Sequence, residues 1–592
     1  MTRIDPHSYY DDSQPKTRAW HLRLRVDFER KVLDGEATLL FRRHTEGTLD
    51  LDTRGLTIHR VYVTANAEVL PFELGPEDPI LGRRLRVVLP PDTMGLTIAY
   101  ETSPEASGLQ WLNPAQTEGK QHPFLFSQCQ AIHARSLLPC QDCAAVRVPY
   151  DAQVLVPDPL SAVMSANLQA VLPAFPGWRM FKFKMPQRIP PYLFALSVGE
   201  LESRDLSARS RVWAEPSTVD RAAWEFADVE SMIQAAEGLF GPYDWDRFDL
   251  LVLPPSFPYG GMENPRMTFL TPTLLSGDRS LVDVVAHELA HSWTGNLVTN
   301  ATAEHFWLNE GFTVWAERRI LRALHGPEAE ALSWAIGGRD LAESLKRFSQ
   351  HPELTRLRTH LEGIDPDEAF SNIPYEKGAR LVRALELAAG PEAFEGFLRA
   401  YMSHFRFTSI TTEQFCAFVE EQLPGLLDQV NAKAWLDGEG LPANAPTFHS
   451  ERLETLTAMG TAWAKGERPE PAAMAAWDPK ELLIFLQHLP RELSTQDCAW
   501  LDEQLQLTSR GNHEILVEWL SIAAASDYEP AFPKLREVLG RVGRMKYLRP
   551  LYAALGRHPR TQALGREVFA SAAPGYHSLS RRVAEGVMES WG

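Results

Sequence analysis

The sequence lacks long hydrophobic runs and has few cysteines. No stretch of about eighteen apolar residues occurs, which excludes a membrane-spanning helix. The N-terminal residues 1–6 do not form the apolar core that marks a signal peptide. Five cysteines in a chain of 592 residues do not make a disulfide framework. These absences predict a cytoplasmic protein that does not bind a membrane.

An excess of positive charge is also absent. The chain has 59 Lys and Arg residues against 77 Asp and Glu residues, a formal net charge of −18. This balance argues against a nucleic-acid partner and favours cationic substrates. The apolar share of 44% and the charged share of 23% are ordinary for globular proteins. The length predicts three or four domains, which can bury enough surface for a monomer.

One segment has the pattern of a hydrolytic metal site. His287 and His291 lie four residues apart on a predicted helix over 281–298, so both side chains share one face and can hold one ion. Glu288 lies a quarter turn away, where it can reach a water without binding the metal. Glu310, separated from His291 by eighteen residues, is the expected third ligand on a second helix. Two imidazoles and one carboxylate leave a fourth tetrahedral position open.

The surroundings of this motif argue against a chance occurrence. The predicted helix is mostly apolar, so its polar side chains cannot all face water. Burying an unsatisfied imidazole or carboxylate costs several kcal/mol, on the order of the whole stability of a small domain. We therefore predict one bound zinc ion, although cobalt or manganese would fit the same ligands in vitro.

A second motif lies upstream, in the run Tyr259-Gly260-Gly261-Met262-Glu263. Two glycines beside a carboxylate suit an edge strand that another backbone approaches closely. An extended peptide can add to such an edge. Glu263 would then hold the ammonium group of the substrate, so the position of cleavage would be set by the distance from the N-terminus of the substrate. The alternative is a proline-bounded turn with one solvated acid.

Together these motifs resemble the M1 (gluzincin) family of zinc aminopeptidases, and within it the leukotriene A4 hydrolase branch. The resemblance extends along nearly the whole chain. Further matching segments are residues 126–133, 138–142, 305–311, 365–367, 374–378, 543–546 and 549–551.

The expected architecture is a multidomain α+β protein with three parts. Alternating apolar residues in 1–201 predict an antiparallel β domain, with strands expected at 22–28, 84–89, 96–101, 181–185 and 192–198. Residues 202–445 form the thermolysin-like zinc domain that the resemblance implies. A Gly- and Pro-rich linker at 438–446 precedes amphipathic helices in 446–592, which predict an armadillo- or HEAT-like solenoid.

The resemblance assigns the catalytic roles. Glu288 is the expected general base, and Tyr375 is the expected hydrogen-bond donor to the oxyanion. The residues expected around the substrate backbone and its amino group are Gln130, Tyr259, Gly260, Gly261, Met262 and Glu263. From position alone, Glu317 either orients a ligand histidine or makes a solvent ion pair.

Three further residues are expected to read the rest of the substrate. Asp367 resembles the acid that recognises a basic first side chain. We therefore expect the enzyme to remove N-terminal residues that include basic ones. Arg544 and Lys546 match the cationic pair that holds the far carboxylate of a short peptide. Phe370 replaces a tyrosine of the leukotriene hydrolases and alters the wall where a lipid epoxide would lie.

Several alternative functions remain open at this stage. The same zinc site would serve an endopeptidase, but such an enzyme does not need Glu263. A bifunctional enzyme that also hydrolyses a lipid epoxide is the main alternative, and a non-catalytic solenoid scaffold is the structural one. Cys140 and Cys143 form a CxxC pair that we interpret as ordinary loop cysteines.

Overall fold

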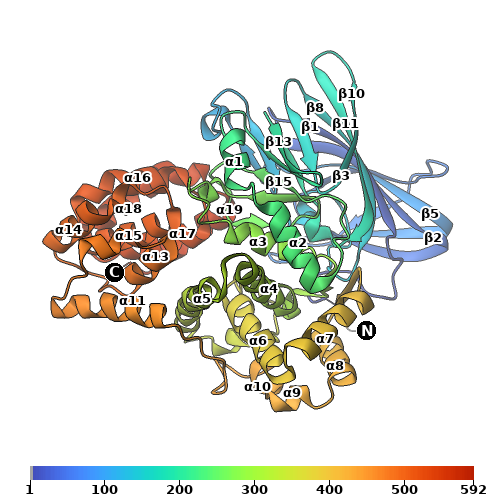
Figure 1. The fold of residues 1–592 in the computed structure, drawn as a ribbon. Helices are drawn as coiled ribbons and strands as arrows, with labels where there is room; N and C mark the ends of the chain where they lie inside the picture. Colours follow the sequence, from blue (N-terminus) through green and yellow to red (C-terminus); the bar gives the residue numbers. More distant parts are fainter. Residues whose placement is uncertain (1–4, 592) are drawn as a thin grey trace.

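The computed structural model describes residues 5–591, with the backbone alone for residues 43 and 44. A β-rich N-terminal part, a mixed central part and a helical C-terminal part follow one another along the chain (Figure 1). This confirms the predicted multidomain α+β class. Among residues 5–591, no helix is long and apolar enough to cross a membrane.

The N-terminal part is built on a large twisted sheet. Its strand order is β10-β11-β8-β1-β2-β5-β3, with β4 also paired to β5. The strands are β1 (Ala19–Asp27), β2 (Val32–Thr53), β3 (Thr57–Val63), β4 (Phe72–Leu74), β5 (Arg83–Glu101), β8 (Val148–Pro157), β10 (Asn167–Pro173) and β11 (Trp178–Ile189). Every second side chain of β1 is buried, as the sequence alternation predicts. The expectation of a purely antiparallel domain is wrong at one pair, because β1 and β8 run parallel.

A smaller antiparallel sheet connects this part to the active site. Its order is β6 (Leu109–Leu112), β7 (Phe124–Ser127), β12 (Leu196–Gly199) and β9 (Ser161–Met164). The predicted strand over 192–198 is wrong in its first half, where residues 191–193 form a 3₁₀ turn. Pro190 and Pro191 explain the difference, because neither can donate a backbone hydrogen bond to a sheet.

The central part packs helices against a mixed sheet. The strand order is β13 (Glu202–Ser207), β14 (Ser210–Ala214), β15 (Asp249–Val252), β17 (Met267–Leu270) and β16 (Gly261–Met262), with β16 at one edge. The short strands β18 (Val298–Asn300) and β19 (Thr408–Ile410) pair separately. The helices are α1 (Val219–Glu225), α2 (Val229–Phe240), α3 (Asp283–Ala290), α4 (Trp307–His325), α5 (Pro327–Arg347), α6 (Gly378–Ala389), α7 (Pro391–His404), α8 (Thr412–Gln422), α9 (Leu426–Gln429) and α10 (Ala432–Leu436).

The metal-motif helix is shorter than its predicted span of 281–298. The chain leaves the helix after Ala290 and turns at Gly295, whose φ of +140° favours glycine. A Cβ at Gly295 would also lie 2.8 Å from Nδ1 of His291. The turn therefore contacts the side chain of His291 and leads directly into β18.

The C-terminal part is a two-layered stack of helices. The helices are α11 (Glu451–Ala462), α12 (Pro471–Met474), α13 (Pro479–Gln487), α14 (Thr495–Leu505), α15 (His513–Ala525), α16 (Phe532–Arg541), α17 (Met545–Leu555), α18 (Pro559–Ala572) and α19 (Ser578–Glu589). Helices α11, α13, α15, α17 and α19 pack in succession, and α16 packs on α18. This arrangement agrees with the predicted helical solenoid.

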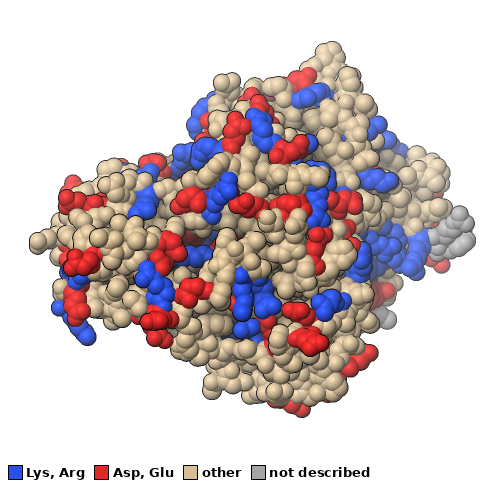
Figure 2. Space-filling view, viewed as in Figure 1, with Lys and Arg blue, Asp and Glu red and all other residues tan. Residues whose placement is uncertain are grey.

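We propose the domain boundaries at residues 201 and 445 that the sequence suggests. In their support, β12 ends at Gly199 before β13 starts, and an irregular segment separates α10 from α11. On the face shown in Figure 2, acidic and basic side chains are interspersed among other residues.

Two glycines allow the helices of the active site to approach closely. Gly311 on α4 lies against Gly378 at the start of α6, and a Cβ on Gly311 would be 2.7 Å from the Gly378 Cα. The contact directly follows Glu310 in the chain. The backbone approach therefore fixes the distance between α4 and the turn that carries Tyr375.

We expect Gly311→Ala to lower the free energy of unfolding by about 2 kcal/mol, because the new methyl group overpacks this contact. The matched control is Gly238→Ala on α2, where none of the described residues places an atom within 4 Å of a Cβ. That control should gain up to about 1 kcal/mol from the better helix former. Urea unfolding followed by tryptophan fluorescence measures both changes, and equal stability of the two variants would contradict the packing argument.

Candidate active site

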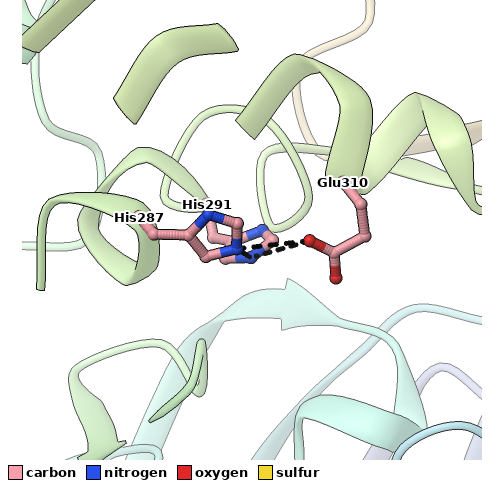
Figure 3. Close-up of side chains that lie close together, drawn as sticks. All are labelled: His287, His291 and Glu310. Carbon is pink, nitrogen blue, oxygen red and sulfur yellow. Dashed lines mark hydrogen bonds and ion pairs between the residues drawn. The ribbon is translucent and has the colours of Figure 1, made fainter. Parts of the chain in front are cut away.

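Helices α3 and α4 bring together the three predicted metal ligands. His287 lies on α3, His291 caps its C-terminal end one turn later, and Glu310 faces them from α4 (Figure 3). Nε2 of His287 lies 3.1 Å from Nε2 of His291, and these atoms lie 3.3 and 3.5 Å from Oε2 of Glu310. The sequence spacing places the ligands on one helix face, and the packing of α4 supplies the third.

The hydrogen bonds behind the two imidazoles determine their tautomers. Nδ1 of His287 lies 3.0 Å from a carboxylate oxygen of Glu317, and Nδ1 of His291 lies 3.2 Å from the carbonyl oxygen of Thr294. Both partners accept hydrogen bonds, so both Nδ1 atoms carry the proton. Each Nε2 atom therefore directs a lone pair toward the other. The position of Glu317 favours the histidine-orienting alternative over a solvent ion pair.

Two lone pairs and a carboxylate at these distances fit a bound cation. Oε2 of Glu310 faces both nitrogens and makes no well-directed hydrogen bond within residues 5–591. Burial lowers the pKa of His291 to about 4, which keeps this ligand neutral. Burial also lowers the pKa of His287, but the hydrogen bonds with Glu310 and Glu317 raise this pKa well above its usual range. The nitrogen and oxygen donors are those that zinc prefers in hydrolytic sites.

Two buried carboxylates lie beside the ligand set. The ligand atoms of Glu263, Glu288 and His291 fall within 4.8 Å of one another. Burial, followed by the charge of Glu310, raises the pKa of Glu263 to about 8. Burial raises the pKa of Glu288 well above its usual range. This density of acids makes the site favourable for cationic groups.

The edge strand β16 lies directly against the general-base candidate. A Cβ on Gly261 would overlap the carboxylate of Glu288, so only glycine permits this approach. Of the described strands, β17 alone pairs with β16, which leaves the other edge available to an extended peptide. Oε1 of Glu263, which follows the strand, is buried without a hydrogen-bond partner in the described part of the chain.

The other glycine of the pair approaches a different part of the molecule. A Cβ on Gly260 would lie 2.6 Å from Nη2 of Arg544. Arg544 is buried, and it shares Glu514 with Lys546, at 3.4 Å and 2.9 Å respectively. Burial by itself would raise the pKa of Glu514. The charges of Lys546 and Arg544 outweigh burial and lower this pKa to about 2. The charge of Asp340 also reaches Lys546 and raises its pKa, so two acids surround the two cations.

Tyr375 reaches the metal ligands from a tight turn before α6. Its ring stacks on His287 with centroids 6.1 Å apart and an angle of 17° between planes. Burial raises the pKa of Tyr375 well above its usual range, so the hydroxyl stays protonated and can donate. The next residue, Glu376, pairs with Arg318 and Arg380 and fixes the turn.

A mostly apolar cavity of about 100 Å³ opens beside these residues. Gln130, Tyr259 and Phe370 line it, and the rings of Tyr259 and Phe370 meet with centroids 5.8 Å apart. Asp367 lies in its wall but is already paired with two side chains, His133 and Arg582. Met262, by contrast, is buried in the apolar core, so only its backbone faces the edge of the sheet.

Some of these contacts have no signal in the sequence. Arg582 and Glu514 are ordinary charged residues on C-terminal helices, far from every motif. His133 belongs to a matching segment, but its partner Asp367 is 234 residues away. The two residues of the CxxC pair are free, buried thiols, and burial raises the pKa of each well above its usual range. Such thiols are unreactive, as the interpretation of loop cysteines expects.

Family models match nearly the whole chain. The Peptidase M1 N-terminal domain matches residues 7–193, the Peptidase family M1 domain residues 224–435, and the Leukotriene A4 hydrolase, C-terminal model residues 477–588. Leukotriene A-4 hydrolase of Xenopus laevis is 40% identical over 571 residues, 93% of each chain. Leucine aminopeptidase 2 of Yarrowia lipolytica is 40% identical over 588 residues, 94% of this chain and 89% of the relative.

Solved structures give the same result. The yeast leukotriene A4 hydrolase in complex with bestatin superposes with a TM-score of 0.91 at 32% identity, covering 99% of this chain and 97% of the other. An M1 zinc metallopeptidase of Deinococcus radiodurans shares the fold over 75% of this chain and 99% of its own, with a TM-score of 0.59 and 23% identity. From the ligand geometry, the three family models and these relatives, the chain belongs to the M1 family of zinc aminopeptidases, in its leukotriene A4 hydrolase branch.

Proposed function

We propose that this zinc aminopeptidase removes single residues from short peptides that have a free N-terminus, and that Glu263 recognises the amino group. One observation carries the proposal. A buried carboxylate oxygen without a donor among the described residues lies at the end of an unpaired sheet edge, beside the metal ligands. An ammonium group satisfies both its hydrogen-bonding capacity and its charge.

His287, His291 and Glu310 would hold the zinc ion. When bound, zinc polarises the scissile carbonyl and activates water at neutral pH. Glu288 takes the proton from the attacking water and passes it to the departing amine. Its carboxylate is confined by the backbone of Gly261, which supports this placement.

The remaining residues orient the substrate. The peptide backbone extends along Gly260 and Gly261, and Gln130 contributes to the pocket for the first residue. The protonated hydroxyl of Tyr375 donates a hydrogen bond to the developing oxyanion. Arg544 and Lys546, which share Glu514, attract the carboxylate at the far end of a short peptide.

The same observations weigh against the other functions. An endopeptidase does not need Glu263 to bind a free amino group, and a non-catalytic scaffold does not need Glu288 and Tyr375. A lipid epoxide stays a second predicted substrate class, favoured by the apolar cavity and by the name of the Xenopus relative. Phe370 offers no hydroxyl in that cavity. We also propose a monomer and a cytoplasmic location, which free cysteines support.

The first test measures release of p-nitroaniline from leucyl-, alanyl- and arginyl-p-nitroanilide. A chelator should abolish activity and added zinc should restore it. Glu288→Gln should lower kcat by at least about 100-fold, since it removes the general base. Its zinc content, measured by atomic absorption, should stay at the wild-type level. A zinc-loaded wild-type protein that cleaves none of the three substrates would overturn the aminopeptidase proposal.

A second test concerns the free amino group. Glu263→Gln should lower kcat/KM for leucyl-p-nitroanilide by about 100-fold, because it removes a charge-assisted hydrogen bond in a buried site. N-acetylation of the substrate should abolish cleavage by the wild type. If wild type and Glu263→Gln cleaved the free substrate equally well, Glu263 would have no part in holding the amine.

A third test concerns the residue behind His287. Glu317→Ala should weaken zinc binding by about 10- to 100-fold, because the imidazole loses the acceptor that fixes its tautomer. Glu317→Gln keeps an acceptor oxygen and should retain most of the affinity. Glu328→Ala, at an exposed position on α5, removes the same charge as a control. Competition with a fluorescent chelator measures all three, and equal affinities for the two alanine variants would contradict the role of Glu317.

A further inference from the structure

Asp367 lies in the wall of the active-site cavity, where the sequence predicts a reader of basic side chains. The cavity also contains Gln130, Tyr259 and Phe370, and Phe370 in turn contacts Tyr375 with ring centroids 6.0 Å apart. A first side chain that enters beside Tyr375 therefore points along the same wall as Asp367.

Two side chains already pair with the carboxylate of Asp367. One oxygen, Oδ2, lies 2.9 Å from Nε2 of His133 and 2.9 Å from Nη2 of Arg582. Nδ1 of His133 lies 3.2 Å from the guanidinium of Arg54, which can only donate, so Nε2 carries the proton given to Asp367. Burial alone would raise the pKa of Asp367, but His133 and Arg582 lower it, so the acid is ionised and paired.

The partner arginine comes from the last helix of the chain. Arg582 lies on α19, which Figure 1 draws on the inner side of the C-terminal helices. Its other terminal nitrogen lies 3.6 Å from Asp365, so it bridges two acids. The preceding turn is held in place, because the ring of His577 stacks on Phe126 of the N-terminal part at 6.3 Å. The C-terminal helix thus reaches the substrate cavity from a fixed position.

The other charged side chains in the cavity wall are also paired. Asp142 accepts from Arg135, Asp5 lies against His7, and Arg356 binds Glu439. The rest of the wall is mostly apolar and includes Ile132, Phe306, Leu357 and Pro374. A basic side chain would have to displace an existing cation or lie next to it, whereas an apolar one needs neither.

We propose that Arg582 determines specificity: by occupying Asp367 from the C-terminal helix, it makes the cavity select apolar first residues over basic ones. This inference rests on the proposed aminopeptidase function. It revises the expectation of basic residues that the sequence raised. The name leucine aminopeptidase carried by the Yarrowia relative agrees with it.

The test compares Arg582→Gln with Arg581→Gln. Arg581 is the adjacent residue on α19, is exposed and forms no ion pair with residues 5–591, so its replacement removes the same charge without touching Asp367. We expect Arg582→Gln to raise the ratio of kcat/KM for arginyl- over leucyl-p-nitroanilide by about tenfold, mainly through a lower KM for the arginyl substrate. Arg582→Met, which keeps the length of the side chain, should act in the same way. Arg581→Gln should leave the ratio at its wild-type value.

A double substitution tests whether the effect passes through Asp367. Adding Asp367→Asn to Arg582→Gln should return the ratio to within about twofold of the wild type, because the released acid is gone. If the ratio in Arg582→Gln stays equal to that in Arg581→Gln while the melting temperature falls, Arg582 only docks the helix and the proposal is overturned. A wild type that prefers the arginyl substrate would also overturn the proposal, whereas one that cleaves none of the leucyl, alanyl and arginyl substrates would refute the underlying aminopeptidase function, so the two failures can be told apart.

Discussion

Two imidazole nitrogens 3.1 Å apart, with a carboxylate oxygen beside them, need a proton or a metal cation between them. The rest of the active site is arranged around this requirement. Glu317 and the carbonyl oxygen of Thr294 accept from the outer ring nitrogens, and Glu310 supplies a negative oxygen. The close contact of Gly311 with Gly378 sets the position of the helix that carries this carboxylate. The packed helices thus hold three donor atoms close enough to bind one metal ion.

The excess of buried acid explains the preference for a substrate amine. Glu263, Glu288 and Glu310 lie close together in a dry environment, where one divalent ion does not balance three carboxylates. A substrate ammonium supplies the missing positive charge. It can do so only at the N-terminus of a peptide, so the electrostatic balance and the exopeptidase specificity have a common physical origin.

Parts of the chain that are distant in sequence meet along one short strand. Gly261 touches Glu288 of the central part, and Gly260 touches Arg544 of the helical part. The helical part contributes again through Arg582, whose contact with Asp367 balances the charge of the cavity. The C-terminal helices therefore contribute charged side chains at two places beside the active site.

The sequence by itself determined the metal-binding motif, the glycine pair before Glu263 and the fold class, because these depend on local spacing and on periodic burial. It overestimated the length of the motif helix, since the turn at Gly295 depends on contacts with His291 and Asn309. The charge state of Asp367 and the ion pairs of Arg544 were decided only by the tertiary structure. Arg582 is 215 residues from Asp367 and Glu514 is 30 residues from Arg544, and an ion pair between separate helices leaves no periodic trace in the chain. Pairing across domains depends on how helices dock, and no local spacing encodes that geometry.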